Sequence, residues 1–123
     1  MKALLMIGAL LGLLSVAIGA AADHGAWAVA MADSVATALR YHQLGAVMIV
    51  LLALAGLKRE DHGLRRGLGI AATLFAIGTL LFSFSIYAAA ISGIRGLTNI
   101  TPLGGVTLMA AWLALLVTGF RAR

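Results

Sequence analysis

The polar side chains that could bind a ligand lie close to the ends of long apolar blocks. Those on one side of the blocks form a candidate outer-face cluster: Asp23, His24, Arg40, Tyr41, His42 and Arg95. Two imidazoles and a carboxylate, here His24, His42 and Asp23, make a ligand set that zinc or copper accepts. The same residue types also cap helix ends and form ion pairs near lipid head groups. We favour capping and ion pairing, and we predict no metal site.

Haem and a quinone are the two cofactors to consider for an apolar protein with these residues. Haem in a membrane bundle needs axial ligands such as paired histidines within the helices. His24 and His42 instead lie at the outer ends of the apolar blocks. A quinone needs only an apolar groove and one or two hydrogen-bonding groups, which His24, Tyr41 and Tyr87 would supply. We predict no resident cofactor and keep an outer-face quinone or metal as an alternative.

The chain lacks the residue arrangements that enzymes use for covalent catalysis. It has no cysteine, which excludes a disulfide, a thiolate metal site and a cysteine nucleophile. The serines of the apolar blocks lie away from the histidines, and no glycine-rich phosphate loop follows a strand. We therefore predict that the protein is not an enzyme.

Transport meets a similar objection. Proton relays and ion pathways depend on ionisable residues inside membrane spans, and the apolar blocks contain none. A passive pore formed by self-association, lined by Thr79, Ser83 and Ser85, is the transport alternative. Hydrogen bonds from these hydroxyls to the helix backbone are the simpler interpretation.

Composition predicts the elements that position these residues. The 123 residues are 63% hydrophobic and only 11% charged, against about 25% charged in soluble domains. A bilayer core of about 30 Å needs roughly 20 apolar residues as a helix, because only helices and closed barrels satisfy their backbone groups there. We predict an all-α integral membrane protein, a single domain over residues 1–123 with four antiparallel transmembrane helices. The expected helices span about 3–22, 34–57, 67–92 and 102–120. The third is long enough to tilt or to contain a loosened turn around Ser83-Phe84-Ser85.

The basic residues predict the orientation. Only Arg40 and Arg95 fall on one side of the blocks, and the remaining seven fall on the other: Lys2, Lys58, Arg59, Arg65, Arg66, Arg121 and Arg123. Short basic loops resist translocation, so both termini are expected in the cytoplasm. The net charge of +5 then lies wholly on that side, where it would attract anionic lipid head groups. No basic helix face carries interleaved aromatic residues, so nucleic acid is not an expected partner.

The first block also resembles a secretory signal peptide, with Lys2, an apolar run and Ala20-Ala21-Ala22. A removable segment has no need of a small-residue stripe, which this block carries at Gly8, Gly12, Ser15 and Gly19. We therefore expect a retained helix.

Small residues at helical spacing predict how the helices pack. Close backbone approach at such residues supplies packing energy in lipid, where the hydrophobic drive between helices is small. The predicted packing residues are Gly8, Gly12, Gly19, Ala72, Ala76, Gly104, Ala111 and Ala114. Thr101 and Pro102 are read as the N-cap and first residue of the fourth helix.

Several motifs resemble a known family of small four-span membrane proteins. They are Ile100-Thr101-Pro102-Leu103-Gly104-Gly105, the serine-containing third block, Arg40-Tyr41 at the second helix and the glycine-rich first block. The family is the YgdD-like family, domain of unknown function 423, which has mitochondrial relatives. The resemblance implies a four-helix membrane bundle but no established activity. One departure is Leu44-Gly45, where the family shows a tyrosine-histidine pair, so the role of that second histidine does not transfer.

Most of the sequence is thus devoted to packing and orientation, and the loops are too short to form a domain. We predict a non-catalytic protein of the bacterial inner (plasma) membrane. It would act as an accessory, assembly or stabilising subunit of a larger membrane complex through helix–helix contacts. The alternatives are a small self-associating transporter or channel, and an outer-face quinone- or metal-binding protein.

Overall fold

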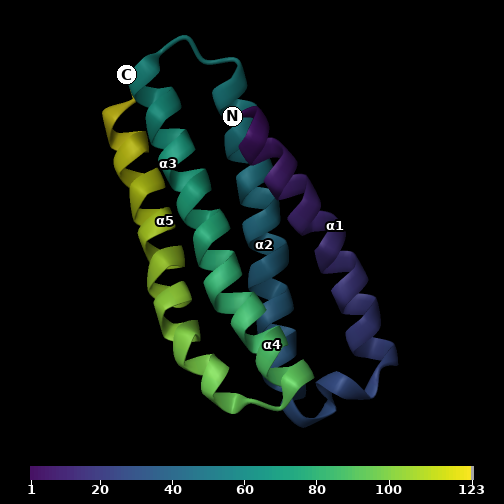
Figure 1. Cartoon of the computed structure of the whole chain (residues 1–123). Coiled ribbons are helices and arrows are strands. Elements are labelled where there is room, and N and C mark those ends of the chain that lie inside the picture. Colours follow the sequence, from purple (N-terminus) through teal and green to yellow (C-terminus); the bar gives the residue numbers. More distant parts are fainter. Residues whose placement is uncertain (123) are drawn as a thin grey trace.

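The chain folds, in this computed structural model, into four long antiparallel helical segments (Figure 1). The structure describes residues 1–122; Arg123, one of the basic residues assigned to the cytoplasmic side, lies outside them. The elements are α1 (Lys2–His24), the 3-10 helix η1 (Ala26–Met31), α2 (Ala32–Leu57), α3 (His62–Thr79), the π-helical turn η2 (Leu80–Phe84), α4 (Ser85–Ser92), the 3-10 helix η3 (Arg95–Ile100) and α5 (Thr101–Arg121). The described residues contain no strand. The predicted all-α class with four spans is confirmed.

Each of the four segments is long and apolar enough to cross a bilayer. They run Lys2–His24, Ala26–Leu57, His62–Ser92 and Arg95–Arg121, with 23, 32, 31 and 27 residues. Among the α-helices, the largest difference from the expected bounds is at α3, which begins at His62 and not near residue 67. Asp61 explains the early start, because its carboxylate accepts hydrogen bonds from the backbone N–H groups of Gly63 and Leu64 at 2.8 and 3.1 Å.

The third span is continuous through α3, η2 and α4, and it contains the loosened turn. That turn is π-helical and covers Leu80–Phe84, so it overlaps the position expected around Ser83-Phe84-Ser85. The Ser83 hydroxyl donates to the Ala38 carbonyl of α2 at 2.7 Å. This hydrogen bond joins the widened turn to α2. It satisfies the Ser83 hydroxyl within the protein, because the bilayer core provides no water to bond to.

The start of α5 differs from the predicted cap. Thr101 is already helical, and its side chain makes no capping hydrogen bond, while Pro102 occupies the first turn as expected. The Ser85 hydroxyl donates to the Phe82 carbonyl and lies 2.6 Å from the Thr101 hydroxyl. Since Ser85 has only one proton to donate, the Thr101 hydroxyl donates to Ser85. Thr101 thus joins α5 to the third span and does not cap a helix. The second helix likewise begins without a side-chain cap from Asp33 or Ser34.

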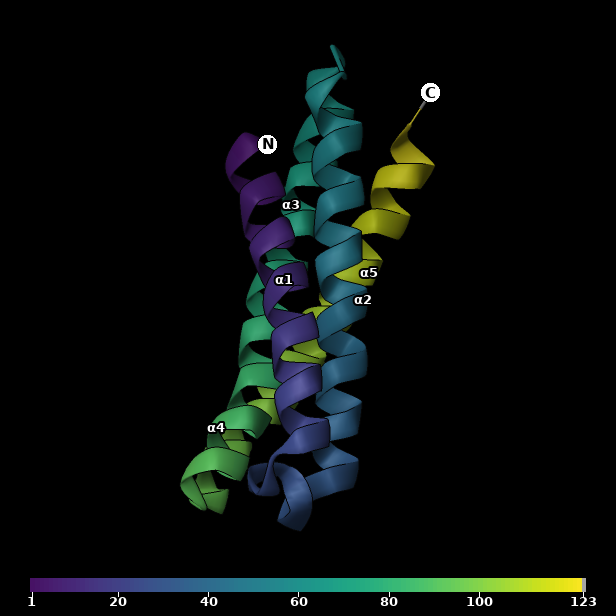
Figure 2. The same ribbon diagram turned by 90° about the vertical axis from the view of Figure 1, so that its right-hand side faces the viewer.

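The helices pack in chain order. The most extensive contacts join α1 to α2, α2 to α3, and α3 to α5. Helices α1 and α5 thus form the two edges, and α2 and α3 the centre (Figures 1 and 2). The main buried cluster lies between the central helices around Ile49 and Phe75.

The small-residue stripes point into these contacts. Gly8 lies against Ile49 of α2. Gly12 faces Ala46 of the same helix, and Gly19 faces Leu39. Gly104 lies against the backbone at Phe82. The remaining predicted packing residues are Ala72, Ala76 and Ala111, which are buried, and Ala114, which is half-buried.

Both described ends of the chain and the turn between α2 and α3 lie at one end of the molecule (Figure 1). The connections through η1 and η3 lie at the other end. The described basic residues assigned to the cytoplasmic side therefore lie at the end that holds the chain termini. Arg95 lies at the opposite end, in η3.

Candidate functional site: a buried polar cluster at the π-helical turn

Histidine 42 is the ionisable residue that the structure places deepest in the protein. Its side chain is 0% exposed. Its Nδ1 atom lies 3.0 Å from the phenol oxygen of Tyr87 in α4. The ring also packs against Phe84, with centroids 5.2 Å apart. A helix from the third span thus supplies the polar partner that a buried imidazole needs.

The second ring nitrogen of His42 is incompletely satisfied. If the Tyr87 phenol donates to Nδ1, the proton of the neutral ring is on Nε2. The ring approaches the backbone of Leu11 in α1, but Nε2 is buried without a hydrogen-bond partner of good geometry. The imidazole therefore keeps one buried donor available, at a cost of about 1–3 kcal/mol if it stays unpaired.

Two further hydroxyl groups complete what we call the buried polar cluster: His42, Thr79, Ser83 and Tyr87. Ser83 and Thr79 are both 0% exposed. Ser83 bonds to the Ala38 carbonyl, whereas the Thr79 Oγ1 atom has no hydrogen-bond partner. A Cβ added to Gly45 would fall on that oxygen, so a Gly45 Cα–H group points at it and makes at most a weak contact.

The buried polar cluster lies within the membrane-spanning part of the bundle. Fifteen residues separate His42 from Leu57, the last residue of α2, which at 1.5 Å per residue is about 22 Å. A hydrocarbon core of about 30 Å that begins near Leu57 therefore contains His42 in its outer third. The apolar block Leu44–Leu57 holds no ionisable residue, but helix α2 continues before it and includes His42.

The predicted outer-face cluster is accordingly divided. Asp23, His24, Arg40 and Arg95 are exposed, and Tyr41 is 42% exposed with its ring packed against Phe82 at 5.1 Å. His42 is not part of this surface, because helix α2 begins ten residues before it and turns it toward α1 and α4. Among residues 1–122, no three His, Asp or Glu side chains come together in a way that could hold a metal ion.

A sequence signal for the burial of His42 exists. Ala38, His42, Gly45, Ala46 and Ile49 recur at spacings of three and four and are all buried. The uninterrupted apolar run within the expected helix 34–57 starts at Leu44, so that run alone does not reach His42. Extending the helical pattern back by two turns places the imidazole on the buried face.

An open groove lies on the other face of α2, between α2 and α5. Its volume is about 400 Å³. The third span forms its floor, since α2 and α5 make few contacts with each other. Its main lining residues are Tyr41, Gly45, Phe75, Phe82, Gly105, Met109 and Trp112. Trp112 stacks edge-on against Phe75 at 5.1 Å and is still 46% exposed. We call this feature the α2–α5 groove.

Comparisons with known proteins agree on one family. Residues 18–105 match the family described as "Protein of unknown function (DUF423)". The chain is 31% identical to a UPF0382 membrane protein of Haemophilus influenzae, over 97% of this chain and 94% of that protein. It is 32% identical to the UPF0382 inner membrane protein YgdD of Escherichia coli K12, over 98% and 91%. It is 30% identical to the UPF0382 membrane protein YwdK of Bacillus subtilis, over 98% of both chains. No solved structure matches the chain.

Proposed function

The chain belongs to the DUF423 family of membrane proteins, and on that premise we propose that it is a non-catalytic accessory subunit. It would assemble or stabilise a larger membrane complex through helix–helix contacts. The observation that supports this proposal is the α2–α5 groove. The predicted packing glycines of the edge helices make contacts within the chain, and the groove is a concave surface that remains open to a partner helix.

The lining of the groove favours a helix as its occupant. Gly105 leaves space on the α5 wall of the groove, and small residues let a second helix approach closely in lipid. Trp112 and Tyr41 are half-exposed at its rim, and these two residue types dominate the energetics of protein interfaces. Trp112 lies 11 residues inside α5, far from the aromatic belt where membrane tryptophans usually lie.

We also propose that the protein has neither catalytic activity nor a resident cofactor. His42, Ser83 and Thr79 are fully buried, so a water-soluble substrate has no route to them in this conformation. The exposed groups at the outer end serve helix ends and head groups in this account.

The orientation is also proposed. We place both termini and the basic loop after α2 in the cytoplasm of a bacterium, with the protein in its inner membrane. The charge distribution supports this, because short basic segments stay on the cytoplasmic side, and YgdD of Escherichia coli is named an inner membrane protein.

Mild-detergent purification with a matched pair of variants tests the accessory role. Gly105→Leu places a side chain in the groove, whereas Val106→Leu changes the next residue, which is exposed and outside the groove. We expect a stoichiometric partner to co-purify with the native chain and with Val106→Leu, and to be lost with Gly105→Leu. A chain that is monodisperse and never co-purifies with a protein would reject the accessory role. Equal retention by both variants would reject the groove as the contact.

A second candidate function is a small self-associating transporter, and His42 is the observation that favours it. Ionisable side chains inside spans mark proton and ion pathways, and the buried Nε2 atom of His42 has no hydrogen-bond partner. This candidate predicts proton or ion flux from the purified chain in liposomes, abolished by His42→Gln. Liposomes without flux would reject it.

A further inference from the structure

A second groove lies between the start of α1 and the first half of α3, at the end of the protein that holds the chain termini (Figure 1). Its volume is about 570 Å³. Met1 and Leu4 line it on one side, and residues between His62 and Leu74 of α3 line it on the other. Among residues 1–122, no other helix contributes a lining residue. We call this feature the α1–α3 groove.

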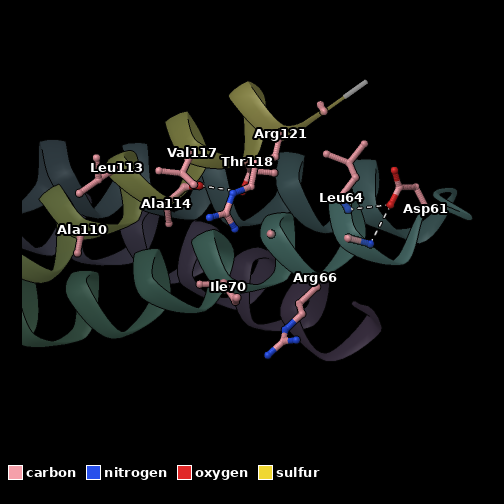
Figure 3. A pocket seen from close by; sticks show the side chains of 13 residues that line it. Asp61, Leu64, Arg66, Ile70, Ala110, Leu113, Ala114, Val117, Thr118 and Arg121 are labelled. Atoms are coloured by element: carbon pink, nitrogen blue, oxygen red, sulfur yellow. Dashed lines mark hydrogen bonds between the residues drawn. The ribbon is translucent and has the colours of Figure 1, made fainter.

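One face of α3 borders the groove. Four of its lining residues recur at spacings of four, three and four, which places them on the same side of the helix: His62, Arg66, Gly69 and Thr73. Figure 3 looks into a different cavity, between α3 and α5, and in that view the Arg66 side chain points away from α5. The face that carries Arg66 therefore belongs to the α1–α3 groove and not to the contact with α5.

Basic side chains gather at one end of the groove. His62, Arg65 and Arg66 lie in the first two turns of α3, and none of the described residues that line the groove is acidic. Asp61 directly precedes α3, but its Oδ1 atom accepts hydrogen bonds from two backbone N–H groups of that helix, and it lines the α3–α5 cavity instead. Arginine binds phosphate through charge-assisted hydrogen bonds, and the anionic groups at a bilayer surface are those of acidic lipids. The charge of this end of the groove thus matches a lipid phosphate.

The floor of the groove beyond these basic residues is apolar. A Cβ added to Gly69 would meet the Cε atom of Met1 at 3.4 Å, so the glycine keeps the floor low beside α1. The Thr73 hydroxyl donates to the Gly69 carbonyl at 2.8 Å and is satisfied within its own helix. Leu4 and Leu74 are half-buried and complete the lining. This part of the groove is suited to a chain of methylene groups.

The groove has a length that fits within one leaflet of a bilayer. Eight residues separate Arg66 from Leu74, which is about 12 Å along a helix. Half of a hydrocarbon core of about 30 Å is about 15 Å. An acyl chain in the groove would therefore contact the protein over most of its depth in the leaflet, starting from the basic end.

We propose that the α1–α3 groove binds one anionic phospholipid of the leaflet next to the chain termini. The phosphate lies at the basic end, beside Arg66, and one acyl chain lies over Gly69 between Leu4 and Leu74. The basic side chains select this ligand over a neutral lipid, and the apolar floor selects it over a soluble phosphate. The proposal needs no partner protein and is independent of the accessory role.

Lipid titration of the purified full-length chain in detergent tests the site. Native mass spectrometry counts bound lipid and gives the dissociation constant for phosphatidylglycerol, for phosphatidylcholine and for glycerol phosphate without acyl chains. We expect one phosphatidylglycerol to bind more tightly than phosphatidylcholine, and glycerol phosphate not to bind. Arg66→Gln should weaken phosphatidylglycerol binding about fivefold, which corresponds to about 1 kcal/mol for one basic residue near the surface.

Matched variants separate the groove from general charge and packing effects. Arg121→Gln removes an arginine from the same end of the protein, but that residue lines the α3–α5 cavity and not the groove, so phosphatidylglycerol binding should not change. Gly69→Leu fills the floor of the groove and should abolish the preference for phosphatidylglycerol, whereas Ala9→Leu on the exposed face of α1 should not.

Three results would each overturn the proposal. They are equal affinity for phosphatidylglycerol and phosphatidylcholine, equal effects of Arg66→Gln and Arg121→Gln, and an unchanged preference in a folded Gly69→Leu variant. If Gly69→Leu does not fold, the comparison of the two arginine variants decides. Binding of glycerol phosphate as tight as that of phosphatidylglycerol would also reject a lipid as the ligand.

Discussion

The glycine pair at the start of α5 provides a sharp test of the packing. A Cβ added at Gly104 would fall on the backbone nitrogen of Phe82 and would lie 2.7 Å from the Leu81 carbonyl carbon and from the Phe82 Cα atom, all in the backbone. Ordinary contacts begin at 3.4 Å, so the added Cβ would be at least 0.7 Å too close to the backbone. Backbone atoms of the π-helical turn cannot rotate away as a side chain can, and Gly104→Ala must therefore push α5 off the third span.

The expected cost follows from two opposing effects. Overpacking costs about 1–3 kcal/mol, with the upper end expected against backbone. Replacing a helical glycine by alanine returns at most about 1 kcal/mol. We expect Gly104→Ala to lower the free energy of unfolding by about 2 kcal/mol.

Gly105→Ala is the matched control. A Cβ at this neighbouring glycine would lie 3.7 Å from the Phe82 ring, an ordinary contact, so the variant should be as stable as the native chain or slightly more stable. Reversible unfolding of the purified protein in mixed detergent micelles measures both free energies. Equal stability of Gly104→Ala and Gly105→Ala would refute the close approach of α5 to the π-helical turn.

Three further predictions concern the buried polar cluster and the orientation. Tyr87→Phe leaves the His42 Nδ1 atom unpaired and should cost about 1–3 kcal/mol of unfolding free energy. Adding His42→Phe to that variant should recover part of the lost free energy. If the costs of the two substitutions simply add, the hydrogen bond between His42 and Tyr87 is refuted. Thr79→Val should be neutral or stabilising in the same unfolding assay, because the buried Oγ1 has no partner to lose, and a loss above about 1 kcal/mol would contradict this. The chain has no native cysteine, so a membrane-impermeant thiol reagent should label Asn99→Cys in intact cells and Glu60→Cys only in opened membranes; the reverse pattern would invert the proposed orientation.

The four spans could be predicted from sequence because their signal is local. Three of the blocks have about the 20 consecutive apolar residues that cross a bilayer, and the shorter second block, Leu44–Leu57, reaches that length only with the helical turns before it. The long third block also indicated a loosened turn, which the structure places at Leu80–Phe84. Excess length in a span requires such an adjustment or a tilt.

The site was harder to predict because it depends on contacts between distant residues. His42 and Tyr87 are 45 residues apart, and only the packing of α2 against α4 turns the imidazole away from the exposed cluster. Thr101 looks like a helix cap in sequence, yet its hydroxyl bonds to Ser85, 16 residues earlier. The α2–α5 groove has no sequence signature of its own, since it arises where two helices both contact the third span and not each other.

The proposed accessory role requires that the α2–α5 groove receive a protein helix within the membrane. Photo-crosslinking in intact membranes tests it, with a photoreactive residue at Met109 in the groove or at Val16 on α1. Both positions are exposed, 65% and 70% respectively. Met109 lies eight residues from the N-terminal end of α5 and Val16 eight residues from the C-terminal end of α1, and these two helix ends lie at the same end of the molecule (Figure 1). We predict one discrete protein adduct from Met109, lost on Gly105→Leu, and only lipid adducts from Val16. Lipid adducts alone from both positions would contradict the account.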